Sequence, residues 1–168
     1  MYDHKPKIWE LFNNDSAATI EMMNQTIAAY AAHGNVVILG RGGSRVLDGM
    51  ADVLKVFVKA SDRVRSERIA KRRGVDAAEA AELIKADDEL HSRFVRLFYG
   101  ADWTDESHFD LVIDTDTTST PEAVAQIAAA ATALPAATGD EHTAAALGVD
   151  AVLARTVAQV LARKAAKP

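Results

Sequence analysis

A glycine-rich turn that follows an apolar run is the part of the sequence best suited to binding an anion. Val36 to Leu39 are all apolar, and the next five residues read Gly-Arg-Gly-Gly-Ser. Glycines let backbone N–H groups approach an anion closely, and α/β folds bind ligands at the carboxyl ends of parallel strands. The residues that we expect to bind phosphate are Gly40, Arg41, Gly42 and Ser44. The alternative, in which the glycines only shape the backbone, is equally open at this point.

Several other kinds of site are excluded by the sequence. A Walker A loop requires G-x-x-x-x-G-K-[ST], but Arg45 stands five positions after Gly40 and the sequence has no Gly-Lys pair. Cysteine is absent, which excludes disulfides, thiolate catalysis and Cys-ligated metal centres. The histidines lack metal-ligand spacing, and no Ser-His-Asp arrangement stands out. The turn is therefore not an ATP-binding P-loop, and no metal site is predicted.

Three arginines form a second candidate anion-binding surface. Arg65, Arg68 and Arg72 are spaced to lie on one face of a helix over residues 61–73. Like charges on one face repel unless an anion lies among them, and a phosphoryl-transfer lid uses arginines in this way. Taken by itself, the pattern favours a solvated helix face on which Asp62 and Glu67 pair with the arginines.

A third candidate lies in residues 84–103. Asp88, His91, Arg93 and Arg96 present polar groups along a helix whose other face is apolar. A carboxylate and basic groups beside a cleft can recognise a nucleobase edge and its phosphate. An amphipathic helix with a surface ion network accounts equally well for the pattern.

The elements that would position these residues alternate between helices and short apolar strands. Buried parallel strands are expected at Val36–Leu39, Leu54–Val58 and Leu111–Ile113, because these runs are continuously apolar and do not alternate. Helices are expected at residues 16–33, capped by Asp15 or Ser16, and at residues 61–73, 76–99 and 121–134. This order predicts an α/β protein with a three-layer parallel sheet.

The composition changes after Leu134. The stretch PAATGDEHT is typical of a connector, and apolar residues within 149–164 recur at helical spacing. We therefore divide the chain into an α/β domain over residues 1–134 and a connector with a helical extension over residues 135–168. The final helix is expected to pack on its own domain; the alternatives are a homodimer contact and a membrane-surface helix.

Charge and composition restrict the class of protein. The 168 residues carry a formal net charge of -5, with 49% hydrophobic and 26% charged residues. These values are typical of a globular protein and give no reason to expect broad binding to nucleic acid or to an anionic membrane. The first residues form no secretory leader or transit peptide, and no run approaches the length of a membrane span. We expect a cytoplasmic protein.

Taken in order, these segments resemble the cytidylate kinase-like family of nucleoside monophosphate kinases. The similarity runs from about Gly34 to Ile127. It includes the Gly-Arg-Gly turn, the arginine-rich lid helix, an Ile-x-x-x-Asp helix that ends in Phe-x-Gly-x-x-Trp, and the strand Phe-Asp-Leu-Val-Ile-Asp-Thr. The resemblance implies a P-loop kinase fold and phosphoryl transfer from ATP, with Mg²⁺, to a pyrimidine nucleoside monophosphate such as CMP or dCMP.

The resemblance also implies roles for single residues. Arg41 would contact the phosphate of the acceptor nucleotide, and Arg65 and Arg68 would belong to the lid over the transferred phosphate. Asp88 would help to hold the pyrimidine nucleotide. The family often has Arg at the position of His91, so a contact between His91 and phosphate would depend on pH.

The sequence departs from the family at its amino end. The family has a strand, a Walker A loop and a helix before the segments matched here, and Tyr2-Asp3 resembles the residues that follow that unit. That strand lies in the middle of the family's sheet, next to the equivalents of Val36–Leu39 and Leu54–Val58, so two strand edges lack a partner. We expect the 168-residue chain to be impaired or inactive as a kinase. Three interpretations follow: a kinase with further sequence upstream, an inactive nucleotide-binding module, and a protein-interaction module.

Overall fold

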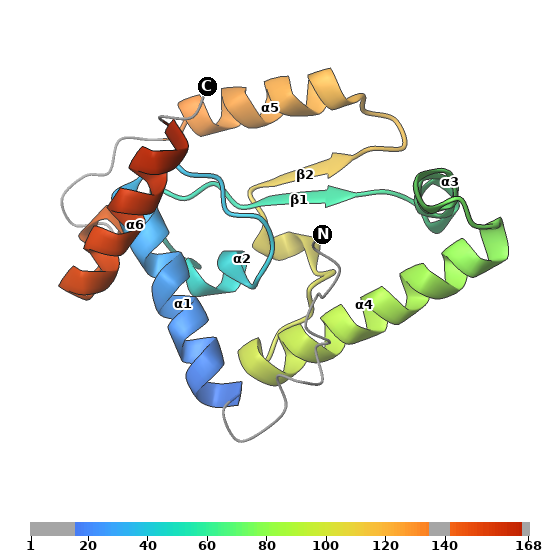
Figure 1. Ribbon diagram of the computed structural model, residues 1–168. Coiled ribbons are helices and arrows are strands. Elements are labelled where there is room, and N and C mark those ends of the chain that lie inside the picture. The colour runs from blue at the N-terminus through green and yellow to red at the C-terminus, as the bar shows by residue number, and fades with distance from the viewer. Residues whose placement is uncertain (1–15, 135–141, 166–168) are drawn as a thin grey trace. The chain divides into compact units, whose positions relative to one another are not determined.

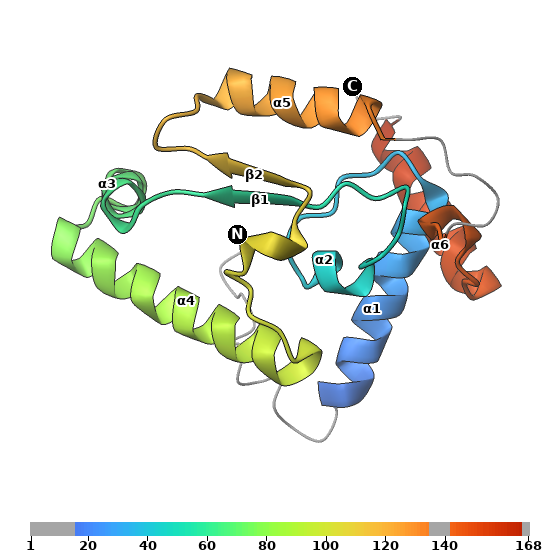
Figure 2. The same cartoon turned by 180° about the vertical axis from the view of Figure 1, so that it is seen from behind.

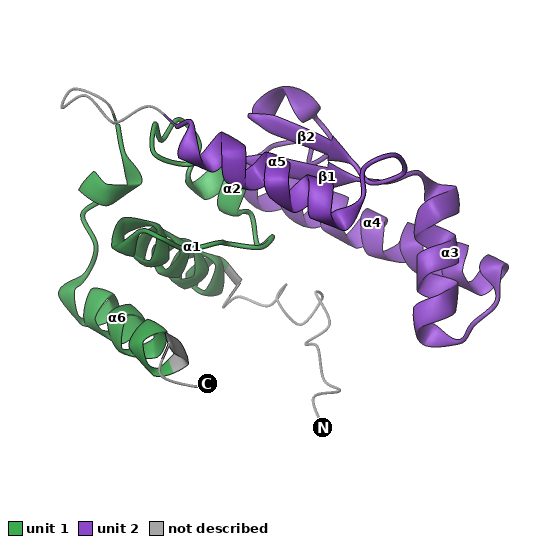
Figure 3. Ribbon diagram, turned by 90° about the horizontal axis from the view of Figure 1, so that it is seen from above, with its two compact units in different colours: residues 1–53, 135–168 green, residues 54–134 purple. Residues whose placement is uncertain are grey.

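The computed structural model describes residues 16–134 and 142–165 (Figure 1). The predicted cap Asp15, the Tyr2-Asp3 pair and most of the predicted connector lie outside the described residues. The chain forms two compact units, residues 1–53 with 135–168, and residues 54–134 (Figure 3). None of the described helices is long and apolar enough to cross a membrane.

The first unit is built from helices. α1 (Ser16–His33) packs against α6 (Ala151–Ala165), and both α2 (Gly43–Val46) and the 3-10 helix η3 (Ala144–Ala146) contact α1 (Figure 2). The Asp52 carboxylate accepts hydrogen bonds from the backbone N–H groups of Ala144 at 2.6 Å and Ala145 at 3.1 Å, which fixes the start of η3. The buried apolar side chains of this unit are Ile20, Ile27, Ala29, Leu47, Ala144 and Val157. The prediction that the final helix packs on its own chain is confirmed.

The segment Val36–Leu39 has no regular secondary structure and is not the buried strand that the sequence predicts. Among the described residues it has no strand partner, and the side chains of Val37 and Leu39 are 97% and 92% exposed. A segment becomes a strand only when a neighbour pairs with its backbone N–H and C=O groups, and apolarity does not reveal whether that neighbour is present. The prediction of a strand is therefore wrong for this segment.

The second unit contains a two-stranded parallel sheet. β1 (Val56–Lys59) pairs with β2 (Leu111–Asp114), with Val56 opposite Leu111 and Lys59 opposite Asp114. Ile113 in β2 is 1% exposed and is the largest fully buried side chain among the described residues. The predicted α/β class is confirmed, and the sheet within the described residues is smaller than predicted.

Helices flank this sheet on two sides. α3 (Asp62–Arg73), α4 (Ala77–Tyr99) and the short 3-10 helix η2 (Glu106–His108) connect the two strands, and α5 (Thr120–Thr132) follows β2. α5 lies along one side of the strand pair and α4 along the other (Figures 1 and 2). The carboxyl ends of both strands therefore open toward the segments that lead into α3 and α5.

Local capping signals explain the bounds of these helices. Ser61 and Asp76 accept hydrogen bonds from the N–H groups of Val64 and Glu79, and Ser119 forms a capping box with Glu122. α3 and α4 end at Gly74 and Gly100, whose φ angles of 71° and 61° favour glycine. Because these signals act over a few residues, the predicted helix bounds agree with the structure to within two residues.

Candidate functional site

The glycine-rich turn of the first unit has an unusual backbone. Gly40, Arg41 and Gly42 have φ angles of 66°, 58° and 75°, so three consecutive residues are left-handed. Glycine adopts this conformation freely, whereas for a residue with a Cβ it costs about 1–2 kcal/mol. Hydrogen bonds from Gly43 N to the Gly40 carbonyl at 3.1 Å and from Arg45 N to the Gly42 carbonyl at 2.8 Å hold the turn closed. Strain of this kind at a non-glycine residue is typical of functional sites.

Close packing explains the next glycine. Gly43 is buried, and a Cβ at this position would lie 3.1 Å from Cγ2 of Ile38. The backbone at the start of α2 therefore rests directly on the segment that precedes the turn. Arg41 is exposed and Ser44 is half-buried, so the turn presents one charged side chain to solvent.

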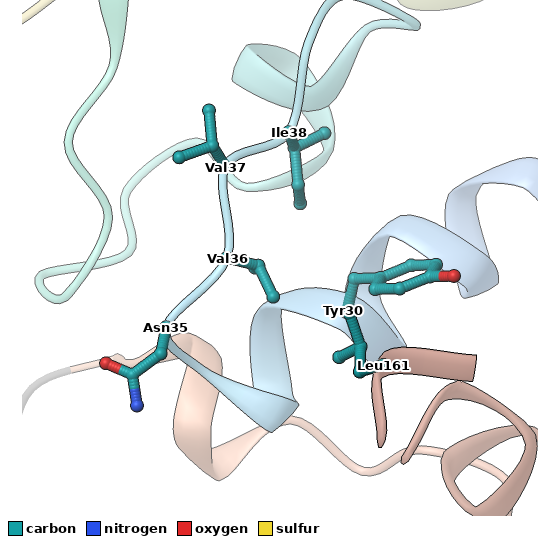
Figure 4. A pocket seen from close by; sticks show the side chains of 6 residues that line it. All are labelled: Tyr30, Asn35, Val36, Val37, Ile38 and Leu161. Carbon is teal, nitrogen blue, oxygen red and sulfur yellow. The ribbon is translucent and has the colours of Figure 1, made fainter. Parts of the chain in front are cut away.

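A hollow beside the turn contains none of the predicted site residues. It has a volume of about 430 Å³ and is lined by Tyr30, Asn35, Val36, Val37, Ile38 and Leu161 (Figure 4). The side chain of Val36 points toward Tyr30 and Leu161, whereas that of Val37 points away from them (Figure 4). The side chains that line it carry no formal charge, so this hollow is a poor site for a phosphate group.

In the second unit, Arg65 and Asp88 form a bidentate ion pair between α3 and α4. Arg65 Nη1 donates to Oδ2 of Asp88 at 2.7 Å, and Nη2 donates to Oδ1 at 2.6 Å. About a third of each side chain is exposed. The hydrogen bonds to Asp88 raise the pKa of Arg65 above its ordinary value. The carboxylate that the resemblance assigns to the pyrimidine thus has both oxygens occupied by a predicted lid arginine.

Arg68, on the same helix, contacts a different partner. Its Nη1 donates to Oγ1 of Thr115 at 2.8 Å, and its Nη2 donates to the Thr115 carbonyl at 2.7 Å. Thr115 directly follows β2, so this guanidinium lies at the carboxyl end of the parallel strands. Arg72, the third arginine of the predicted face, is exposed.

His91 stacks on an aromatic ring. Its imidazole is stacked on the Trp103 ring, with 4.7 Å between the ring centroids and 7° between the planes. Phe57 of β1 contacts the Trp103 ring edge-on, at a centroid distance of 6.1 Å. Packing removes water from the imidazole and lowers the pKa of His91, while the Asp88 carboxylate acts in the opposite direction. His91 therefore favours the neutral form, in which its attraction to phosphate is weak.

Two carboxylates support the carboxyl ends of the strands. Glu106 pairs with the Lys59 ammonium at 2.7 Å, and this contact raises the pKa of Lys59. Asp116 accepts a hydrogen bond from the backbone N–H of Ser61 at 2.9 Å, which lowers the pKa of Asp116. The first contact joins the end of β1 to η2, and the second joins the loop after β2 to the residue that caps α3.

The structure thus groups the predicted site residues into two sets. Gly40, Arg41, Gly42 and Ser44 lie together in the first unit, and Arg65, Arg68, Asp88 and His91 lie on α3 and α4 of the second. Sequence reasoning missed Thr115 and Trp103 as partners of Arg68 and His91. The position of Thr115 at the end of a parallel strand was the available signal.

The residues present do not fit ATP and Mg²⁺ by themselves. The sequence has no Gly-Lys pair of the kind that holds donor phosphates, and within residues 16–134 and 142–165 no three His, Asp or Glu residues are grouped as a metal site.

Comparison with known proteins identifies relatives by sequence. The model of the cytidylate kinase-like family matches residues 6–117. A cytidylate kinase from Methanopyrus kandleri is 36% identical over 108 residues, which cover 60% of this chain and 56% of that protein. The cytidylate kinase from Sulfurisphaera tokodaii is 42% identical over 82 residues, covering 49% of this chain and 45% of that protein. The chain spans about half the length of the curated relatives it matches.

A solved structure supports the fold. The structure of an uncharacterized protein from Eubacterium ventriosum matches 71% of this chain and 75% of its own chain, with a TM-score of 0.63 and 20% identity. Because the family match covers more than half of the sequence and includes the turn, α3, α4 and β2, the resemblance noted in the sequence is confirmed. The chain belongs to the cytidylate kinase-like family.

Proposed function

We propose that this chain binds the phosphate of a pyrimidine nucleoside monophosphate, such as CMP or dCMP, at the turn from Gly40 to Ser44. The observation that carries the proposal is the left-handed conformation of Arg41 between two left-handed glycines. A strained turn that displays one guanidinium is suited to a phosphate, because Arg offers two parallel N–H donors to its oxygens. Membership of the cytidylate kinase-like family supports the choice of nucleotide.

The proposal extends to the second unit. In the family reaction, Arg65 and Arg68 would contact the transferred phosphate, and Asp88 and His91 would contribute to holding the nucleotide. For Asp88 to contact a nucleotide, its ion pair with Arg65 must open or share an oxygen, since both oxygens are engaged. ATP and Mg²⁺ are the donor and metal of the family reaction. A kinase of this type would act in the cytoplasm. Its fold would be the family's three-layer parallel sheet.

Titration calorimetry with CMP tests the proposal. Arg41→Ala and Arg41→Lys are both expected to weaken binding substantially, since Lys cannot reproduce the two-donor contact. Arg155→Ala removes an exposed arginine of α6 and is the matched control. The proposal fails if CMP gives no heat up to millimolar concentration, or if Arg41→Ala binds CMP as well as the unchanged chain.

A second candidate function is a protein-interaction module. It is favoured by one observation, the nearly complete exposure of Val37 and Leu39. An interaction module of this kind could form a homodimer through α6. Val152 of α6 is 68% exposed and is available for such a contact, whereas Val157 is buried within the first unit. Stable self-association without nucleotide binding would favour this function over the first.

A further inference from the structure

We propose that Thr115 is a positioning residue that holds the Arg68 guanidinium at the carboxyl end of the sheet, ready for a phosphate group. The inference rests on the proposed phosphate-binding function and adds a residue to it. Ligands of α/β proteins bind at this end of parallel strands, and Thr115 is the first residue beyond β2.

The hydroxyl of Thr115 has a fixed orientation. Its Oγ1 donates to the Lys59 carbonyl at 3.0 Å, and the Thr115 backbone N–H donates to the same carbonyl at 2.9 Å. A hydroxyl carries one proton and two acceptor lone pairs. Because the proton is directed to Lys59, the lone pairs are left for Nη1 of Arg68, which lies 2.8 Å away.

The second contact fixes the plane of the guanidinium. Nη2 of Arg68 donates to the Thr115 carbonyl at 2.7 Å, so two donors of one planar group meet two oxygens of one residue. Two parallel contacts of this kind determine direction as well as distance. Arg68 has five N–H donors and is exposed, so donors remain for an anion.

The charge of Arg68 distinguishes it from Arg65. The two oxygens of Asp88 neutralise Arg65, whereas the hydroxyl and carbonyl of Thr115 carry no charge. The Asp116 carboxylate interacts with Arg68 electrostatically, whereas Asp88 also contacts Arg65 through two short hydrogen bonds. Arg68 is therefore the lid arginine whose charge is better preserved for a phosphate.

Inorganic pyrophosphate is a suitable probe, since it mimics the phosphoryl groups that a lid arginine would meet. We expect Thr115→Val, which keeps the shape and removes the hydroxyl, to weaken calorimetric binding of pyrophosphate about tenfold, as expected for one charge-assisted hydrogen bond. Arg68→Ala should have at least this effect, and adding Thr115→Val to it should cause no further loss. Thr115→Ser retains the hydroxyl and should bind pyrophosphate as well as the unchanged chain. Thr117→Val, in the same loop, is the matched control.

A spectroscopic measurement separates positioning from general stability. In the free protein, the guanidinium NMR signals of Arg68 should show restricted rotation in the unchanged chain and in Thr115→Ser, and free rotation in Thr115→Val. Should Thr115→Val fold poorly, Arg68→Lys provides a second test. It keeps the charge, loses the double contact, and should weaken pyrophosphate binding similarly.

The inference is overturned if pyrophosphate does not bind up to millimolar concentration. It is also overturned if Thr115→Val or Arg68→Ala binds pyrophosphate as well as the unchanged chain, or if loss of the Thr115 hydroxyl leaves the rotation of the Arg68 guanidinium unaffected. The proposed function is tested separately, because CMP binding through Arg41 concerns the other unit. If CMP binding fails while pyrophosphate binding depends on Thr115, the inference stands and the proposed function does not. If CMP binds through Arg41 while pyrophosphate binding does not depend on Thr115, the proposed function stands and the inference does not.

Discussion

Single side chains decide how the two predicted lid arginines differ. Arg65 is held by a carboxylate with both oxygens engaged, and Arg68 by a neutral hydroxyl and a carbonyl. Sequence spacing places both on one helix face, but it does not specify which partner each meets across the fold. The difference between the two arginines is therefore made by contacts that are distant in sequence.

The bidentate pair should contribute measurably to stability. Arg65→Ala is expected to lower the free energy of unfolding by about 1–2 kcal/mol, because the pair is partly buried and charge-assisted, with a discount for solvent screening. Arg63 pairs with Glu67 on the exposed face of the same helix, so Arg63→Ala should cost at most about 0.5 kcal/mol. Urea denaturation measures both, and equal losses would argue against a special role for the bidentate pair.

The stacked imidazole predicts a dependence of stability on pH. The pKa of His91 is lowered in the folded chain from its ordinary value of 6.5. Below pH 6.5 the unfolded chain therefore binds more protons than the folded chain. The contribution of His91 is therefore present above pH 6.5 and is lost as pH falls toward the folded pKa. His91→Phe keeps a ring against Trp103 and should lose less stability than the unchanged chain between pH 7.5 and pH 5. The comparison is made by denaturant melts at both pH values.

At the scale of elements, the helices and the strands β1 and β2 were predictable, but the state of the segment Val36–Leu39 was not. Ser61, Asp76 and Ser119 cap their helices and glycines end α3 and α4, all within a few residues of sequence. Strand pairing joins residues far apart, so apolarity identified Val36–Leu39 as readily as β1 although only β1 is paired among the described residues. The candidate site followed the same division: the turn was recognisable from its glycines, whereas Thr115 and Trp103 required the fold.

The final helix should be essential to the first unit. Val157 of α6 is 3% exposed and Val152 is 68% exposed, which makes them a matched pair on one helix. Val157→Asp should destabilise the chain by more than about 3 kcal/mol or cause aggregation, because it removes buried apolar area and introduces an unpaired charge. Val152→Asp should change stability by less than about 0.5 kcal/mol. Truncation after Gly139, which removes η3 and α6, should resemble Val157→Asp; a truncated chain with an unchanged melting temperature would contradict this role.

For the whole molecule, the sequence lacks a recognisable cradle for a donor nucleotide. Phosphoryl transfer depends on backbone N–H groups, a lysine and a metal that position and neutralise the donor phosphates. The turn Gly40 to Ser44 supplies glycines and Arg41 but no Gly-Lys pair. Family membership and the turn support acceptor binding, and neither supplies the donor side.

Purified 168-residue protein is therefore expected not to phosphorylate CMP or dCMP at an enzymatic rate. A coupled assay with ATP and Mg²⁺ measures the rate of ADP release, and Arg41→Ala serves as the background. Turnover near a typical value of about 10 s⁻¹ would show that the donor is held by residues other than a Walker A loop.

The most direct test of the account is to follow the backbone amide signals of the glycine-rich turn by NMR while CMP is added. We predict that the signals of Gly40, Gly42, Gly43 and Ser44 shift with CMP and do not shift with cytidine, which lacks the phosphate. Arg41→Ala should abolish these shifts. Absence of shifts at the turn up to millimolar CMP, or equal shifts with cytidine, would contradict the assignment of the turn as a phosphate site.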